Sequence, residues 1–253
     1  MKKHRKSRAL LSTLSSATRD LLFPPRCVGC DDLLPPFARH TTVFCPVCRA
    51  AWETAVIEAA NDVVGDAERE LIYLVHYRSG QEGGVPERLI YHLKHRGDPR
   101  TFAFLARRLA SRLPQTASAH PSERADELLL FTYPPRRRSA VNRDGFDQAR
   151  RLAKAMAKSC GGKMVSLVRR THRKTTAQKM LNAEDRTANA ISAYVLTPNA
   201  SAILRDRTVV VCDDLCTTGA TLNRCADLLL EAGARRVILC SVARTAKWKM
   251  QHT

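Results

Sequence analysis

The sequence predicts an α/β protein with a mostly parallel sheet flanked by helices, preceded by a small cysteine-rich module. Two observations predict this fold class. From about residue 68 onward, apolar runs of strand length alternate with amphipathic segments of helical period. Before that point, the chain carries two closely spaced pairs of cysteines and little periodicity. With 253 residues, the chain can hold one large domain and an appendage.

The apolar pattern gives the expected elements in order. Strands are expected at Glu70–Tyr77, Glu127–Tyr133, Thr208–Cys212 and Val237–Val242. Helices are expected at Thr101–Leu113, Phe146–Ser159 and Ala220–Leu230, and residues 115–124 are expected to form a loop. Strands that alternate with helices favour a parallel sheet covered on both faces.

The amino-terminal third divides into three further regions. Residues 1–23 combine a basic tail with leucines at helical spacing, which predicts an amphipathic helix packed on the body; a helix lying on a membrane surface is the alternative. Arg19 and Asp20 interrupt this segment, so a signal peptide is disfavoured. We expect residues 24–52 to form the cysteine module, residues 53–67 a helical connector, and residues 68–253 the α/β domain.

The charge of the chain favours anionic partners. Its 42 Lys and Arg outnumber 24 Asp and Glu, which gives a formal net charge of +18. Nucleic acid, phosphorylated small molecules and anionic membrane surfaces are the classes attracted by such a charge. No segment approaches the roughly 20 consecutive apolar residues that span a bilayer. We therefore expect a cytoplasmic protein without a membrane span.

The cysteine spacing predicts a metal site. Cys27, Cys30, Cys45 and Cys48 form C-x2-C-x14-C-x2-C, whereas the other five of nine cysteines are scattered. Four thiolates at this spacing suit tetrahedral Zn2+, and the odd total argues for a reducing compartment over a disulfide framework. A purely structural four-cysteine zinc module and a ribbon that contacts nucleic acid or a partner both remain open. Catalysis at this metal is disfavoured because thiolates fill every position.

A second motif predicts a ligand site late in the chain. In VVVCDDLCTTGAT, an apolar strand is followed by Asp213 and Asp214, and then by a Thr/Gly-rich turn into a helix. Ligands of parallel α/β sheets bind beyond the carboxyl ends of strands. The helix start after Gly219 suits a phosphate, and carboxylates accept hydrogen bonds from sugar hydroxyls. These residues predict a ribose-5-phosphate site; an acidic pair that only caps the helix is the alternative.

Here the residues carry a resemblance. VVVCDDLCTTGAT resembles the thirteen-residue motif with which type I phosphoribosyltransferases bind phosphoribosyl pyrophosphate. The wider chain resembles the ComF family of competence-associated, phosphoribosyltransferase-like proteins. The segments that carry this wider resemblance are LLFPPRCVGC, YHLKHRGD, YPPRRRSAVNRDGFDQA and AQKMLNAEDRTANAISAYVL, in the family's order.

The resemblance implies roles for individual residues. Asp213 and Asp214 would contact the ribose hydroxyls and are the candidate catalytic residues. The candidate 5′-phosphate loop is Cys216, Thr217, Thr218, Gly219, Ala220 and Thr221. Mg2+ would bridge ligand oxygens, and the activity would be transfer of a 5-phosphoribosyl group. The resemblance also implies a part in DNA uptake, single-stranded DNA as a ligand and a DNA-translocating helicase as a partner. The alternative is a non-catalytic DNA-handling protein that keeps the fold as a sensor or scaffold.

A basic stretch supplies candidates for the pyrophosphate. They are Arg136, Arg137 and Arg138 beyond a strand end, with Arg170 and Lys174 near a loop that is mobile in the family. These cations suit either phosphate oxygens or a nucleic-acid backbone. The chain departs from the family where Arg-Gly-Phe-Asn-Gln becomes Asp144-Gly145-Phe146-Asp147-Gln148. A helix start beside it would lower the pKa of the Cys216 thiol, but a functional role for this thiol is disfavoured.

Overall fold

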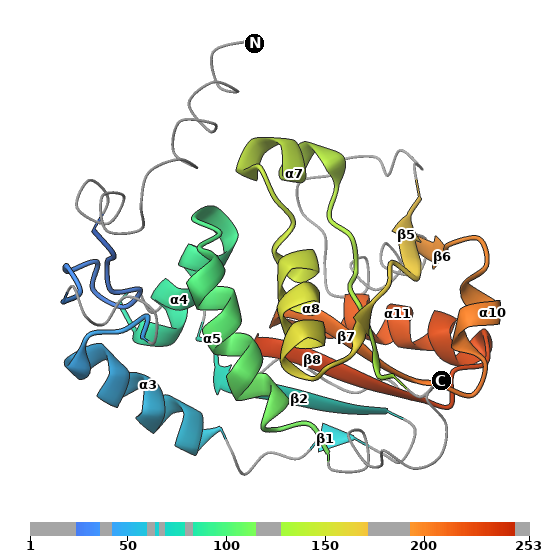
Figure 1. Cartoon of the computed structure of the whole chain (residues 1–253), viewed down its shortest axis with the longest axis horizontal. Helices are drawn as coiled ribbons and strands as arrows, with labels where there is room; N and C mark the ends of the chain where they lie inside the picture. Colours follow the sequence, from blue (N-terminus) through green and yellow to red (C-terminus); the bar gives the residue numbers. More distant parts are fainter. Residues whose placement is uncertain are drawn as a thin grey trace.

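The computed structural model describes residues 24–35, 42–59, 64–65, 69–78, 83–114, 128–171 and 193–245. The expected amino-terminal helix, the expected loop at 115–124 and Lys174 lie outside these residues. The central sheet has the order β1-β2-β8-β7-β3-β4 (Figure 1), and only β1 runs antiparallel to its neighbour. The prediction of a mostly parallel sheet is confirmed. Its strands are β1 Val64–Gly65, β2 Arg69–His76, β3 Leu130–Thr132, β4 Lys163–Met164, β7 Thr208–Cys216 and β8 Arg236–Arg244.

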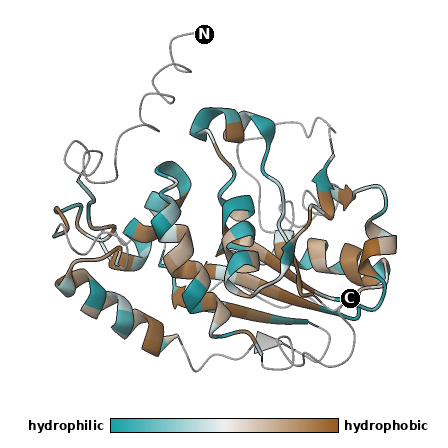
Figure 2. Ribbon diagram, viewed as in Figure 1, coloured by the Kyte–Doolittle hydropathy of each residue, from teal (hydrophilic) through white to brown (hydrophobic). Residues whose placement is uncertain are grey.

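Helices cover both faces of this sheet and bury an apolar core on each. On one face lie α4 (Val85–His95), α5 (Pro99–Ala110) and α8 (Gln148–Ser159), packed on the side of β7 that carries Val210 and Cys212. On the other face lie α10 (Ala200–Leu204), α11 (Ala220–Glu231) and a small sheet of β5 (Val168–Arg170) and β6 (Tyr194–Leu196). Figure 2 shows the hydrophobic strands enclosed between these layers.

The structure corrects several expected boundaries. Strand β7 continues to Cys216 instead of ending at Cys212, because β8 pairs with it residue by residue as far as Arg244. The expected connector at 53–67 is not one helix: α3 (Pro46–Glu58) begins inside the cysteine module, and β1 lies within the same stretch. The other expected elements keep their type with shifted ends. Helices α4, α7 (Arg138–Asp144) and α10 and strands β4 to β6 were not predicted; most are too short for a periodic pattern to emerge.

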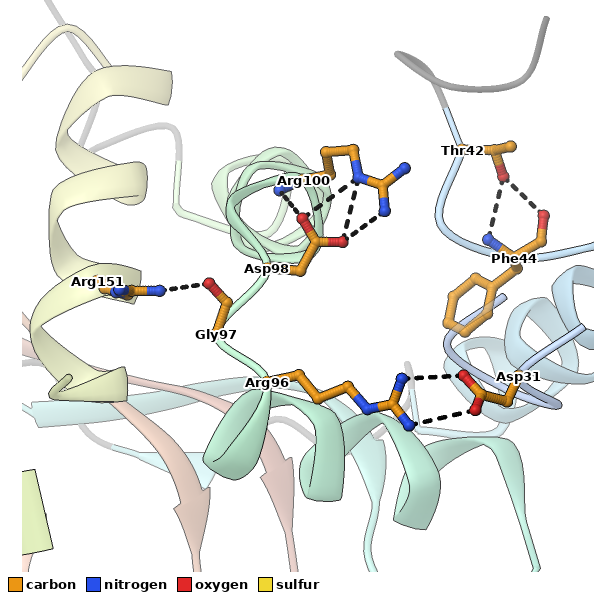
Figure 3. Close-up of polar contacts among 8 residues, drawn as sticks. All are labelled: Asp31, Thr42, Phe44, Arg96, Gly97, Asp98, Arg100 and Arg151. Carbon is orange, nitrogen blue, oxygen red and sulfur yellow. Dashed lines mark hydrogen bonds and ion pairs between the residues drawn. The ribbon is translucent and has the colours of Figure 1, made fainter. Parts of the chain in front are cut away.

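A short segment after α4 joins the cysteine module to the α/β core (Figure 3). Arg96 forms a bidentate ion pair with Asp31 of the module, with N···O distances of 3.1 and 3.2 Å. The guanidinium of Arg151 on α8 donates to the carbonyl of Gly97 and lies 4.2 Å from the ring centroid of Phe146. The segment therefore ties the module, α4 and α8 together.

Gly97 is required at this junction by both conformation and space, which gives a testable prediction. Its φ is +60°, and a Cβ there would lie 2.5 Å from Arg151 and 2.8 Å from Phe146. Gly97→Ala should lower the free energy of unfolding by about 2–3 kcal/mol, from left-handed strain and the clash together. The matched control is Gly161→Ala, where φ is +65° but a Cβ meets nothing within 4 Å. Equal losses in urea unfolding of the two variants would contradict a packing role for Gly97.

Within the described residues, no helix is both long and apolar enough to cross a membrane.

Candidate functional site

The two adjacent carboxylates lie within the last part of β7, not after it. Asp214 is buried, whereas Asp213 is half-buried. The backbone N–H of Asp214 donates to Oδ1 of Asp213 over 2.8 Å. From the start of α8, Nε2 of Gln148 lies 3.4 Å from Oδ2 of Asp214 and donates to it. The amide oxygen of Gln148 is buried and accepts no hydrogen bond from any described residue. The contact with Gln148 holds the carboxyl group of Asp214 in one orientation.

The environment of Asp213 makes ionisation of its carboxyl group unfavourable. Burial, followed by the charge of Asp214, raises the pKa of Asp213 well above its ordinary value. The carboxylate of Asp147 adds to this effect from the start of α8. A site of this kind is stabilised by a ligand that supplies hydrogen-bond donors, such as sugar hydroxyls, or by a cation.

The turn after β7 presents a helix start to the same edge of the sheet. Gly219 is the N-cap residue of α11 with φ of +80°, a left-handed conformation that favours glycine. The hydroxyl of Thr218 accepts from the N–H of Ala220 over 3.4 Å, and the first turn of α11 carries no acidic residue. Thr245, at the end of β8, anchors the turn by donating its hydroxyl to the carbonyl of Thr217 over 2.9 Å. The turn is therefore fixed, and the positive end of the helix dipole is not neutralised by an acid in that turn.

A third group of contacts fixes the loop after β3 beside the acidic pair. Asp147 caps α8 by accepting from the N–H of Arg150 over 3.1 Å, and it also accepts from the N–H of Arg136 over 3.0 Å. The side chain of Arg136 forms a 2.9 Å ion pair with Asp144. Hydrogen bonding to Arg143, together with Arg136, lowers the pKa of Asp144 to about 2. The two carboxylates that depart from the family's pattern thus hold Arg136 in place by its backbone and its side chain.

Opposite this loop, the small sheet carries a further candidate. Arg170 on β5 donates to the hydroxyl of Tyr194 on β6 over 2.9 Å, and its guanidinium carbon lies 5.1 Å from the ring centroid. Burial raises the pKa of Tyr194 to about 12, and the nearby Asp213 carboxylate contributes. Arg137 and Arg138 are exposed at the start of α7. Two of the arginine candidates with described positions therefore already have partners: Arg136 pairs with Asp144 and Arg170 with Tyr194.

The helix start does not lower the pKa of the Cys216 thiol. The thiol is buried at the end of β7 and not exposed at the helix start, so burial raises its pKa instead of lowering it. Cys216 contributes to the site through its backbone, since its carbonyl accepts from the N–H of Thr245 over 2.9 Å.

The cysteine module brings its four predicted ligands together. The sulfur atoms of Cys27, Cys30, Cys45 and Cys48 all lie within 4.8 Å of one another, and the Cys30–Cys45 pair is 3.7 Å apart. Tetrahedral Zn2+ with bonds of about 2.3 Å requires sulfurs about 3.8 Å apart, so the cluster fits the ion. The sulfur of Cys27 also accepts backbone N–H groups from Gly29 (3.3 Å) and Cys45 (3.2 Å). Such hydrogen bonds stabilise a thiolate, which supports a metal-binding cluster.

Sequence reasoning missed the supporting residues of the site. Gln148 reaches Asp214 across 66 positions of the chain, and Tyr194 reaches Arg170 across 24. Gln148 stands in a quoted motif, which is the one signal that could have drawn attention to it. Tyr194 stands in another quoted segment, AQKMLNAEDRTANAISAYVL, but no role was inferred for it.

Comparison with known proteins identifies the class of the carboxy-terminal part. Residues 140–252 match a family model described as phosphoribosyl transferase domain. This segment contains the acidic pair, the turn and α11. These carboxy-terminal residues are thus similar to phosphoribosyl transferase domains, and the amino-terminal part adds a cluster of four cysteines that could hold a metal. A search of curated proteins gave no match.

Solved structures with local likeness include an allosteric regulatory enzyme of purine biosynthesis (16% identity, TM-score 0.37). A glutamine phosphoribosylpyrophosphate amidotransferase from B. subtilis, described as complexed with ADP and GMP, gives 14% identity and a TM-score of 0.35. Each match covers 60% of this chain and 30% of the other. A purine phosphoribosyltransferase from Pyrococcus horikoshii gives 18% identity and a TM-score of 0.30, over 59% of this chain and 91% of the other.

Proposed function

We propose that the protein is a ComF-like phosphoribosyltransferase that binds phosphoribosyl pyrophosphate with Mg2+ and transfers its 5-phosphoribosyl group. The observation that carries the proposal is the acidic pair at the end of β7, followed directly by the Gly219 turn and the start of α11. The match of residues 140–252 to the phosphoribosyl transferase domain supports it independently.

In this proposal, the ligand divides among three parts of the site. The 5′-phosphate lies at the turn Cys216–Thr221 and the helix start, where backbone N–H groups and threonine hydroxyls donate to it. The ribose hydroxyls donate to Asp213 and Asp214. The pyrophosphate lies beside the loop after β3, within reach of Arg137 and Arg138 and of Arg170 across the site.

Transfer then depends on position and charge. The bond from the anomeric carbon to pyrophosphate breaks, and a bond to an acceptor base forms on the opposite face of the sugar. The acidic pair stabilises the positive charge that develops on the sugar ring, and arginine stabilises the leaving pyrophosphate. Bound Mg2+ would supply positive charge to the leaving pyrophosphate, and the carboxylate oxygens of Asp213 and Asp214 would suit this hard cation.

The experiment that tests this proposal is calorimetric titration of the zinc-loaded full chain with phosphoribosyl pyrophosphate and Mg2+. We expect saturable binding with one site per chain, and weaker binding when Mg2+ is omitted. Absence of binding to the folded protein would overturn the proposal. If binding is observed, an acceptor screen with release of pyrophosphate as the readout tests the transfer step separately.

Gln148 gives a further prediction for the same assay. Gln148→Met keeps the size of the side chain but removes the donor to Asp214, so affinity for phosphoribosyl pyrophosphate should fall about tenfold, the loss of one hydrogen bond to a charged group. Gln148→Glu should lose more, because it places a carboxyl group beside Asp214. Equal affinities of the Met and Glu variants would show that Asp214 does not depend on this contact.

A second candidate function is the handling of single-stranded DNA during uptake, in the cytoplasm and beside a DNA-translocating helicase. The observation that favours it is a basic row on α8, where Arg150, Lys154 and Lys158 are exposed at intervals of four residues. Like charges at this spacing destabilise an isolated helix, and a polyanion would relieve the repulsion.

The triad Arg136, Arg137 and Arg138 separates the two candidate functions. Its replacement by alanine should weaken binding of phosphoribosyl pyrophosphate. The affinity for single-stranded DNA should fall only by the amount that the loss of three positive charges produces. Replacement of Arg150, Lys154 and Lys158 by glutamine should have the reverse effect. If the row variant binds DNA as the unaltered protein does, the second candidate function loses its support.

A further inference from the structure

A groove lies between the cysteine module and α5, away from the acidic pair. It has a volume of about 210 Å3. One wall is Thr42 and Val43, which follow the first cysteine pair, and the other is one face of α5. Figure 3 shows Thr42 and Phe44 on one side of this space and Arg100 on the other. A volume of this size accommodates a single aromatic heterocycle.

The α5 wall has an aromatic middle and cationic ends. Arg100, Ala103, Phe104 and Arg107 line the groove and follow the spacing of one helix face. The ring of Phe104 is half-buried and packs edge-on against Phe44, with centroids 5.7 Å apart. Phe104 therefore belongs to a fixed aromatic cluster and presents part of its ring to the groove.

The two guanidiniums differ in how they are held. Arg100 donates to Oδ2 of Asp98 from Nε over 3.1 Å and from a terminal nitrogen over 2.8 Å, and Nε also lies 3.3 Å from Oδ1. These contacts fix the orientation of the guanidinium, and its other terminal nitrogen makes no hydrogen bond with a described residue. Arg107 is exposed and makes no ion pair with any described residue. Seven residues of α-helix separate their Cα atoms by about 10 Å along the helix axis, and Asp98 holds the Arg100 guanidinium at the start of α5, so the two cations offer two positions for phosphate.

We propose that this groove binds one nucleotide of a single-stranded nucleic acid. The base stacks on Phe104, and the phosphates on either side of its sugar contact Arg100 and Arg107. A free mononucleotide carries phosphate on one side of its sugar only and leaves one of the two cations unmatched. Bases in a duplex are already stacked on each other, so they are not available to stack on Phe104 in a groove of this volume. The inference rests on the second candidate function and locates its nucleotide-binding surface.

The test uses the zinc-loaded full chain and a fluorescent oligothymidine of about twelve nucleotides, a length within the range that single-strand sites cover. Anisotropy titrations at several salt concentrations give affinity and salt slope. Phe104→Leu keeps an apolar side chain in the cluster but removes the ring, and affinity should fall about fivefold or more. Arg107→Gln should lower the slope of log K against log salt by about 0.7, the contribution of one phosphate contact on a single strand.

The matched control is Arg205→Gln, an exposed arginine just after α10 that does not line the groove. It removes the same charge and should change affinity and slope less than Arg107→Gln does. Unlabelled thymidine monophosphate and a duplex of the same length should compete at least tenfold less well than the unlabelled strand. Zinc content and thermal unfolding of each variant establish that it is folded.

Four outcomes overturn the inference. If the groove variants have the same affinity and salt slope as Arg205→Gln, the groove does not bind the strand. If thymidine monophosphate competes as well as the unlabelled strand, the groove does not require a strand. Binding that survives the groove variants but is lost with Arg150, Lys154 and Lys158 refutes the groove and leaves the second candidate function standing. No strand binding at all refutes both. Titration with phosphoribosyl pyrophosphate is unaffected in each case, so failure of the first candidate function is measured separately.

Discussion

Replacement of both Asp213 and Asp214 by asparagine is expected to abolish saturable binding of phosphoribosyl pyrophosphate and to raise the unfolding temperature of the zinc-loaded protein. Hydrogen bonds to a charged group contribute about 1.5–3 kcal/mol each, so loss of two carboxylates should weaken binding by a factor of about 100 or more. The gain in stability follows from the half-buried Asp213, whose ionised form burial and Asp214 disfavour.

The pH dependence of this gain has a definite sign. Because the folded-state pKa of Asp213 is raised, the folded protein binds its proton more tightly than the unfolded chain does. The contribution of Asp213 to stability therefore falls as pH rises from the unfolded value, near 3.9, through the raised folded value. The double variant lacks this decline, so its advantage in unfolding temperature should grow with pH over that window.

The control is Asp206→Asn, which removes an exposed carboxyl group in the turn before β7, where φ of +56° tolerates asparagine. It should leave ligand binding unchanged and show no pH-dependent gain. If the double variant binds phosphoribosyl pyrophosphate with unchanged affinity, the acidic pair is not part of the binding site. A variant that is less stable than the unaltered protein at neutral pH would mean that the pair is stabilised by contacts that asparagine cannot replace.

The sequence was sufficient for the parts of the fold with strong local patterns. The apolar runs at β7 and β8 predicted two buried strands, and the cysteine spacing predicted the cluster of four sulfurs. Local pattern was misleading at Asp213 and Asp214. Charged residues normally end a buried strand, but here pairing with β8 carries the strand past both. The end of a strand depends on its neighbour's length, which the strand's own residues do not encode.

The supporting contacts of the site depend on the fold as a whole. The ion pair of Arg136 with Asp144 requires α7, a helix of seven residues that ends at the left-handed Gly145. Such a helix is too short to give a periodic signal. The sequence alone therefore suggested that Arg136 was available to pyrophosphate, whereas its side chain is paired within the protein. An anionic ligand would have to compete with Asp144 for it.

Replacement of Cys45 by serine is expected to remove the metal and expose the core of the cysteine module. The substitution is selective because Cys45 is also the N-cap residue of α3, where its side chain accepts from the N–H of Cys48. Serine is a preferred N-cap residue, so the helix start is kept while one metal ligand is lost. Structural Zn2+ contributes on the order of 10–16 kcal/mol in comparable small modules, far more than the cap.

Trp52 reports this loss directly. It is fully buried in α3 and stacks on Phe44, with ring centroids 5.6 Å apart. In a Trp248→Phe background it is the remaining tryptophan of the two in the sequence. Cys45→Ser should bind well under one Zn2+ per chain in competition with a chelator, and Trp52 emission should shift to longer wavelength. Cys160→Ser, a thiol outside the module, should change neither. Trp52 emission that stays unchanged after chelation of the unaltered protein would mean that the aromatic cluster of Phe44, Trp52 and Phe104 holds the module together without metal.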